Sequence, residues 1–223
     1  MINASDRGNS GRSERDVELL DVFGPGGVYV TSLPRWKVHE EGLWHQVFHC
    51  LVVRSGRPAR VLLQRRRSSS NAFPGMLDLS ATGHLLAGEE PVDGIRELRE
   101  ETGLDASRSR LVSLGRRLLV DDSGEGLNRE IVHAFLLTDD TPLGDLRLDP
   151  GEVAGFVELT IHELLLLLAD PARSVAAFEV DPAGSVRRVE CRGAELVPAV
   201  DGYWTVLATM AERYVAGVRQ LGV

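Results

Sequence analysis

The chain contains many short runs in which apolar residues dominate or alternate with polar ones, as they do in β-strands. Two such runs, 47–54 and 59–65, flank Ser55-Gly56-Arg57-Pro58, and a Gly/Pro break between apolar runs is typical of a hairpin. Residues 17–32 hold two shorter apolar stretches around Gly24-Pro25-Gly26-Gly27, which predicts another pair of strands. Further strands are expected at 77–81, 111–120, 130–137 and 153–159, with a last hairpin formed by 175–180 and 186–191.

Fewer segments show helical spacing. We expect helices over residues 92–102, 161–169 and 201–220; in the last, apolar residues recur at Trp204, Leu207, Ala211, Val215 and Val218. Strands that outnumber helices, with an apolar side on each helix, favour a mixed α/β sandwich. Residues 1–15 are polar and rich in Gly and Ser, which predicts a disordered tail.

Composition narrows the class of protein. A net charge of -8 argues against a nucleic-acid-binding surface, which would carry a basic patch. The N-terminus is polar rather than apolar, and the aliphatic run 164–169 is far too short for a bilayer, so we expect neither a signal peptide nor a membrane partner. Two cysteines, Cys50 and Cys191, are too few for a disulfide scaffold and favour a cytoplasmic location.

The most informative stretch is residues 83–104, a glycine-bounded segment with five glutamates. On a helix, Glu97, Glu100 and Glu101 lie together, because residues three and four apart share a face. Arg96 precedes Glu100 by one turn and can orient it. Like charges on one face repel each other unless a cation neutralises them, and Mg²⁺ prefers carboxylate oxygens and bridges them to phosphates.

This stretch resembles the Nudix box, the signature of the Nudix hydrolase superfamily. The fixed positions of that pattern are filled by Gly83, Glu89, Arg96, Glu97, Leu98, Glu100, Glu101, Gly103 and Leu104. Six residues separate Glu89 from Arg96 where the pattern has seven, which leaves the placement of Glu89 open. The resemblance implies an α/β/α sandwich with a mixed sheet over residues 16–170. We expect residues 171–223 to add a hairpin and a C-terminal helix packed on the same domain.

The flanks of the box resemble the Nudix branch that includes isopentenyl-diphosphate isomerase. The similar residues are the run 64–67 and the segment from Phe73 to His84. In that branch a cysteine immediately precedes the Gly-His pair, and here the position is Thr82. A threonine hydroxyl cannot replace a thiol of tunable pKa in carbon acid–base chemistry, so isomerisation is disfavoured.

The resemblance implies metal-assisted hydrolysis of a diphosphate. Glu97, Glu100 and Glu101 would hold Mg²⁺ or Mn²⁺, Glu97 or Glu130 would serve as the base, and Arg96 would orient the box carboxylates. Arg65 and Arg66 are candidates for substrate binding, because guanidinium groups match phosphate geometry.

Three histidines offer a further interpretation. His39, His45 and His84 stand where the isomerase branch carries metal-ligating histidines, and together with a carboxylate they would suit zinc, manganese or iron better than magnesium. The alternative is that they are structural residues.

The box leaves the organic part of the substrate open: a nucleoside-diphosphate derivative, a sugar nucleotide, a dinucleotide or an isoprenoid diphosphate. We expect a small-molecule diphosphate as the partner and leave a homodimer open. The competing functions are an isomerase-like enzyme and a non-catalytic ligand-sensing domain, and the second would be expected to lack box carboxylates.

Overall fold

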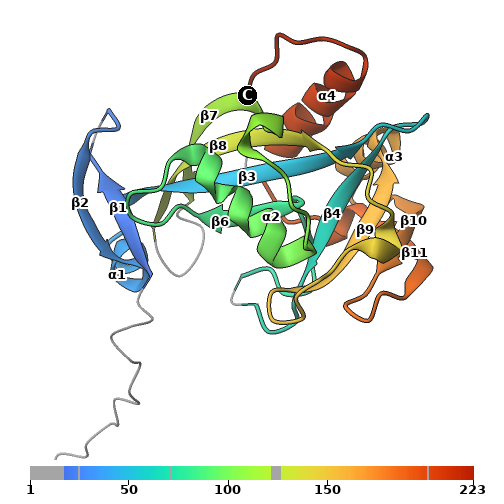
Figure 1. The fold of residues 1–223 in the computed structure, drawn as a ribbon, viewed down its shortest axis with the longest axis horizontal. Helices are drawn as coiled ribbons and strands as arrows, with labels where there is room; N and C mark the ends of the chain where they lie inside the picture. Colours follow the sequence, from blue (N-terminus) through green and yellow to red (C-terminus); the bar gives the residue numbers. More distant parts are fainter. Residues whose placement is uncertain (1–17, 25, 71, 122–126, 200) are drawn as a thin grey trace, which may run out of the picture.

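The computed structural model describes residues 18–24, 26–70, 72–121, 127–199 and 201–223. In the described residues, eleven strands form one sheet with the main order β11-β10-β9-β4-β3-β1-β2 (Figure 1). Off this path, β5 pairs with β4, β6 and β8 pair with β3, and β7 pairs with β8. The strands are β1 (Leu19–Phe23), β2 (Tyr29–Pro34), β3 (Trp44–Arg54), β4 (Arg60–Arg66), β5 (Leu77–Asp78), β6 (Ala81–His84), β7 (Val112–Asp121), β8 (Asn128–Thr138), β9 (Val153–Thr160), β10 (Ser174–Val180) and β11 (Val186–Arg192). Strand β3 pairs in parallel with β8 and antiparallel with its other neighbours, so the sheet is mixed.

Four α-helices accompany the sheet in the described residues: α1 (Arg35–Glu40), α2 (Ile95–Thr102), α3 (Ile161–Ala169) and α4 (Tyr203–Val215). Alternate residues of β3 face different layers. Val47, Leu51 and Val53 share a core with α3 and α4, whereas Phe48, Cys50 and Val52 share a core with Leu98 of α2. Helices therefore cover both faces of the sheet, and the predicted α/β/α sandwich is confirmed.

Most predicted elements occur close to their expected positions, with four differences. The predicted helix 92–102 begins with a 3-10 turn at Pro91–Gly94 before α2 starts. The run 77–81 divides into β5 and β6, which pair with different strands. Helix α4 ends at Val215 rather than residue 220, and the positive φ of Gly217 (91°) follows that end. Helix α1 has six residues, too few for a periodic pattern, and was not predicted.

The C-terminal segment continues the same sheet and core. Strand β10 pairs with β9, and Tyr203, Trp204 and Leu207 of α4 pack among the core side chains of β3 and β8. A boundary at residue 170 remains a prediction, and the predicted tail 1–15 lies outside the described residues. Within the described part of the chain, no helix is long and apolar enough to cross a bilayer.

Candidate active site

The box segment is fixed by the contact between Gly83 and Glu97. Gly83 lies in β6, which pairs with β3, and a Cβ built at this glycine would lie 2.2 Å from the carboxyl carbon of Glu97. That distance is far inside van der Waals contact, so only glycine at this position leaves room for the Glu97 carboxylate where it lies. Gly94 plays a similar part before α2, where a Cβ would lie 2.3 Å from the Cβ of Phe48. The two glycines therefore set the position of the Glu97 carboxylate against the edge of β6.

Arg96 connects the carboxylates of the box. Its guanidinium donates to Glu89 Oε1 at 2.9 Å, to Glu97 Oε1 at 2.5 Å and to Glu100 Oε2 at 3.4 Å. It also donates to the main-chain oxygen of His84 at 2.8 Å. The predicted orienting role of Arg96 agrees with this geometry, although its part in a reaction stays a prediction.

Glu89, which lies in the shortened turn, contacts the backbone of that turn and Arg96. Its Oε2 accepts from the backbone N–H of Leu86 at 2.8 Å, and its Oε1 accepts from Arg96. Both oxygens are thus occupied in holding the turn and the arginine. Within these contacts Glu89 positions Arg96.

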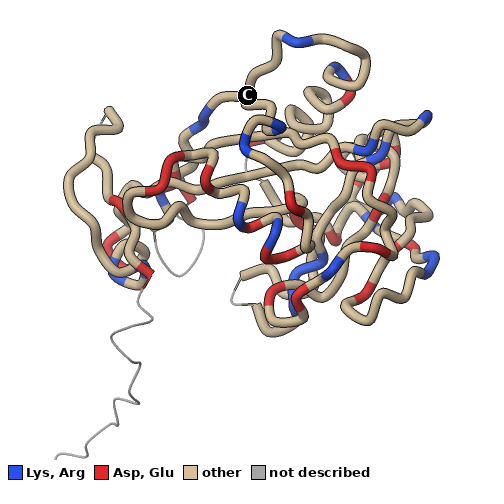
Figure 2. Tube along the Cα trace, viewed as in Figure 1, with Lys and Arg blue, Asp and Glu red and all other residues tan. Residues whose placement is uncertain are grey.

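Glu101 is buried and the Glu97 side chain is 15% exposed, whereas the Glu100 side chain is 47% exposed. Burial, opposed by Arg96, raises the pKa of Glu97 to about 7. Burial also holds the pKa of Glu101 well above its usual range, with further contributions from Glu97 and Asp78. Acidic and basic positions are interleaved along α2 (Figure 2).

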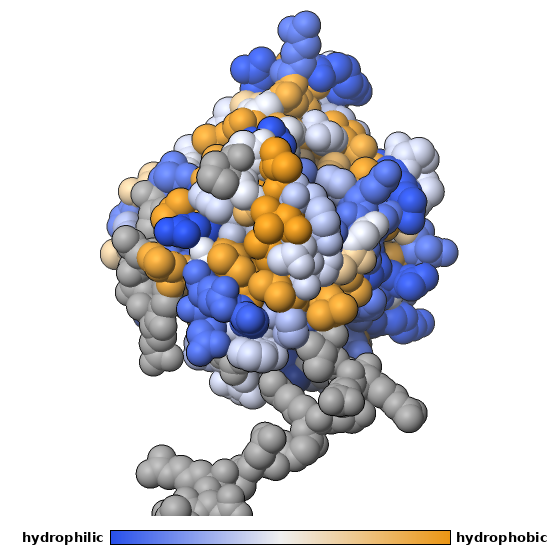
Figure 3. Space-filling model, turned by 90° about the vertical axis from the view of Figure 1, so that its left-hand side faces the viewer, coloured by the Kyte–Doolittle hydropathy of each residue, from blue (hydrophilic) through white to orange (hydrophobic). Residues whose placement is uncertain are grey.

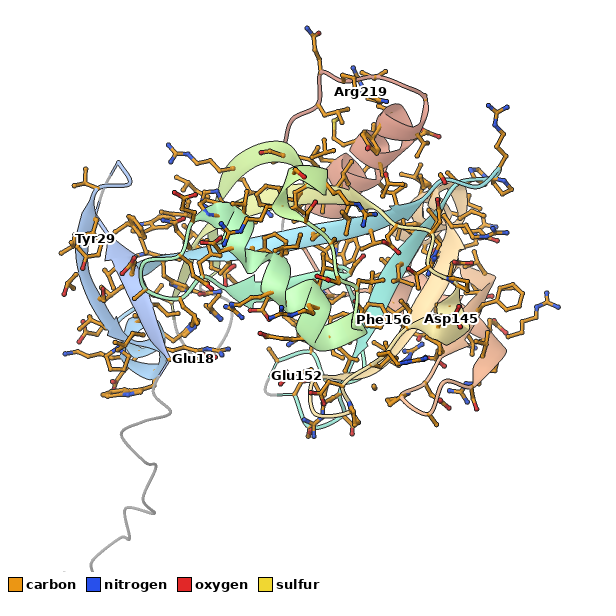
Figure 4. The ribbon with its side chains drawn as sticks, viewed as in Figure 1. Glu18, Tyr29, Asp145, Glu152, Phe156 and Arg219 are labelled. Carbon is orange, nitrogen blue, oxygen red and sulfur yellow. The ribbon has the colours of Figure 1, made fainter. Side chains whose placement is uncertain are left out.

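The surroundings of Glu101 add polar groups that the sequence did not single out. Gln64 Nε2 lies 3.5 Å from Glu101 Oε1, and no described residue hydrogen-bonds the buried Oε2. Asp78 and Glu152 contribute negative charge; Glu152 directly precedes β9 (Figure 4). A buried carboxylate oxygen with no partner among the described residues is the kind of donor that a hard divalent cation prefers.

A histidine cluster lies beside the box strand. His39 comes from α1, His45 from β3 and His84 from β6, and one ligand atom of each lies within 4.8 Å of the others. His39 Nε2 and His84 Nε2 are 3.0 Å apart, His45 Nδ1 is bound to the Leu43 carbonyl at 2.8 Å, and His45 Nε2 has no partner among the described residues. The sequence separated these residues by up to 45 positions, and three elements bring them together.

The electrostatics of the cluster favour neutral imidazole, the form that binds metals. Burial lowers the pKa of His39, His45 and His84, and the neighbouring histidines lower that of His39 and His84 further. Glu130 stands opposite His45 in the register of β3 and β8, and burial raises its pKa, opposed in part by His39. The three histidines thus lie together with neutral rings, and their role as metal ligands stays a prediction.

Arg35 is a cation near this cluster that sequence reasoning missed. It is the first residue of α1, one turn before His39, and its charge contributes to the lowered pKa of all three histidines. Its guanidinium also pairs with Glu18 at 2.8 Å. The i, i+4 spacing of Arg35 and His39 would have been a signal only if the helix had been foreseen.

Arg65 and Arg66, the predicted substrate-binding residues, are occupied by ion pairs. Arg65 binds Glu179 at 2.5 Å and Glu195 at 3.2 Å, and Arg66 binds Asp78 at 2.9 Å. Arg65 thereby ties β4 to the C-terminal hairpin. The structure does not bring these guanidinium groups into contact with the carboxylates of α2.

Comparison with known proteins agrees with the box. A family model described as the NUDIX domain matches residues 43–178. The chain is 32% identical over 197 residues to an uncharacterised Nudix hydrolase of Clostridium acetobutylicum, covering 86% of this chain and 96% of that protein. It is 32% identical over 143 residues to an isopentenyl-diphosphate Delta-isomerase of Cutibacterium acnes, covering 61% of this chain and 69% of the other.

Among solved structures, DR0079 from Deinococcus radiodurans superposes with a TM-score of 0.53 at 21% identity, covering 68% of this chain and 89% of that one. This likeness extends to the fold alone. The relative that aligns along nearly its whole length and the match to the NUDIX domain both agree with the filled box. The chain belongs to the Nudix family and is a Nudix hydrolase.

Proposed function

We propose that this protein hydrolyses the diphosphate linkage of a small molecule with the help of Mg²⁺ or Mn²⁺. The observation that carries the proposal is the carboxylate set on α2, where Glu101 keeps a buried oxygen without a partner in the described residues. Glu97, Glu100 and Glu101 would hold the cation. When bound, the cation would neutralise charge on the diphosphate oxygens and lower the pKa of a bound water.

The positioning of the carboxylates and the proton transfer are assigned to different residues of the chain. Arg96 is held by three carboxylates and the His84 carbonyl, so its role is to position Glu97 and Glu100. Glu97 or Glu130 accepts the proton of the attacking water, because both are carboxylates in low-dielectric surroundings. The products are two phosphate monoesters, or a monoester and inorganic phosphate.

Binding of a negatively charged diphosphate needs positively charged side chains near the carboxylates of α2. A phosphate role for Arg65 and Arg66 requires their ion pairs with Glu179 and Asp78 to open. Arg35 is a second candidate, because its one ion pair among the described residues is a half-exposed pair with Glu18. Exposed ion pairs are weak, so a diphosphate can displace Glu18 at small cost.

The histidine cluster favours a second candidate function. His39, His45 and His84 would hold a transition-metal ion, as the isomerase branch implies, and isopentenyl diphosphate is then the substrate to test. Thr82 disfavours isomerisation. It stands opposite His49 in the register of β3 and β6, and its hydroxyl offers no group that titrates near neutral pH. A ligand-sensing domain is disfavoured, because no box carboxylate is missing.

The test is a screen of nucleoside-diphosphate derivatives, sugar nucleotides, dinucleotides and isopentenyl diphosphate. Each compound is incubated with Mg²⁺ or Mn²⁺, and phosphate is measured with and without added phosphatase. Release that needs phosphatase identifies monoester products, whereas direct release identifies a terminal phosphate. Cation-dependent turnover of at least one class supports the proposal, and no turnover across the panel with either cation contradicts it.

A further inference from the structure

The outer edge of β2 differs from the other long edges of the sheet. Within the described residues β2 pairs only with β1, which leaves the backbone groups of its other side without a strand partner. Strand edges in natural proteins are usually protected by charges, bulges or prolines. Strand β2, Tyr29-Val30-Thr31-Ser32-Leu33-Pro34, carries no charged residue, and its proline lies at the end that leads into α1.

The two comparable edges are protected. Strand β11 carries four charged residues, Arg187, Arg188, Glu190 and Arg192. Strand β7 carries Arg116, Arg117 and Asp121, and a bulge between Ser113 and Gly115 breaks its register. The lack of charge on β2 is therefore specific to this edge.

The same end of the molecule exposes apolar and aromatic side chains. Val28 is 68% exposed, Val30 61% and Tyr29 55%, while Trp36 of α1 is 58% exposed. Tyr29 stands at the outer rim of the fold (Figure 4), and orange hydrophobic residues gather on this face in the space-filling view (Figure 3). Tyr and Trp are enriched where protein surfaces bind each other.

We propose that β2 pairs with β2 of a second copy of this chain, antiparallel about a two-fold axis, so that the sheet continues across a homodimer. A two-fold axis places the same edge of each copy opposite the other and runs the two strands in opposite directions, as an antiparallel pair requires. Pairing with β7 or β11 of another copy would place arginines beside Val28 and Val30. Because β2 carries no charged residue, two copies of it make no like-charge contacts along the pair, although the chain carries a net charge of -8.

Sedimentation velocity from about 1 to 500 µM tests the pairing, because a strand-edge interface lies at the small end of specific interfaces and predicts a Kd in about the micromolar range. We expect the wild-type protein to pass from monomer to dimer across this range, and Val30→Lys to raise the Kd at least about tenfold. Leu118→Lys is the matched control, because Leu118 is 64% exposed on β7 and should leave the dimer unchanged. A wild-type monomer at every concentration overturns the proposal and leaves the edge to a strand of a different protein. A dimer that persists in Val30→Lys overturns it as well.

Cysteine cross-linking gives a second readout that does not depend on the lysine variant folding. Both native cysteines, Cys50 and Cys191, are buried, so the background of intermolecular disulfides is low. The single variants Val30→Cys, Thr31→Cys and Ser32→Cys are oxidised mildly, with Leu118→Cys as the control. We expect a covalent dimer from at least one of the three β2 positions and none from the control. Cross-linking equal to the control at all three contradicts the pairing. Neither measurement depends on enzymatic activity, so the outcome is separate from that of the proposed hydrolysis.

Discussion

The raised pKa of Glu97 predicts that the metal-free protein becomes less stable as the pH rises. An acid with a folded-state pKa of about 7 and an unfolded-state value of 4.5 binds more protons in the folded state between these limits. The stability that protonation supplies is complete below pH 4.5 and is lost as the pH rises to about 7. Each pKa unit corresponds to about 1.4 kcal/mol, so Glu97 costs up to about 3 kcal/mol of folding free energy above pH 7.

Glu97→Gln isolates this contribution, because glutamine resembles the protonated acid. The histidines act in the opposite direction, since their lowered pKa values make the folded state bind fewer protons than the unfolded state below about pH 6.5. They are present in both proteins, so the difference between Glu97→Gln and wild type removes their effect to first order. We expect that difference to be near zero at pH 4.5 and to reach about 2–3 kcal/mol in favour of the variant at pH 8.

The assay is urea denaturation in EDTA at half-unit steps from pH 4.5 to 8, repeated with saturating Mg²⁺ at pH 8. Glu212→Gln, an exposed residue of α4, is the matched control and should follow wild type at every pH. Mg²⁺ should stabilise wild type more than Glu97→Gln, because binding to the folded state alone shifts its stability. A pH-independent difference, or a variant less stable than wild type at pH 8, would refute the assignment of Glu97 as a buried, destabilising carboxylate.

Three further predictions concern the box and its flank. Glu89→Gln should lower the rate of hydrolysis only about tenfold, because Glu89 binds Arg96 rather than a cation. Glu101→Gln should lower that rate about a hundredfold or more. Equal losses in steady-state rate would show that the short turn restores Glu89 to the site. Gly83→Ala should lower the free energy of unfolding by about 1–3 kcal/mol by pushing the Glu97 carboxylate away. Gly56→Ala, whose Cβ would come no closer than 3.4 Å to its neighbours, should stay within about 0.5 kcal/mol in the same denaturation assay. Thr82→Cys should not create isomerase activity, since a misplacement of a catalytic group by about 1 Å can lower the rate a hundredfold. Deuterium uptake from heavy water into isopentenyl diphosphate, catalysed by the wild-type protein above background, would overturn the hydrolase assignment.

Short-range patterns predicted the box geometry. The i, i+3 and i+4 spacing of the glutamates, and Arg96 beside them, is a local property of one helix, and the structure reproduces it. The strands were visible for the same reason, because alternation is read within a few residues.

The parts that could not be predicted depend on contacts between distant residues. Arg65 was proposed to bind phosphate, but its partners Glu179 and Glu195 lie 114 and 130 residues away. The proximity of Asp78 to Glu101 likewise follows from the pairing of β4 with β5. Arg35 was missed because helix α1 is too short to show a period.

The central claim, cation-assisted hydrolysis at the α2 carboxylates, is tested most directly at Glu100. This side chain is the most exposed of the three metal candidates, so Glu100→Gln should leave the fold intact while removing a ligand. The measurement is the Mg²⁺-dependent rate of phosphate release from the best compound of the screen, with Glu212→Gln as the control and circular dichroism to verify folding. The account predicts a loss of about a hundredfold or more in Glu100→Gln and none in the control. Full activity in a well-folded Glu100→Gln protein would contradict it.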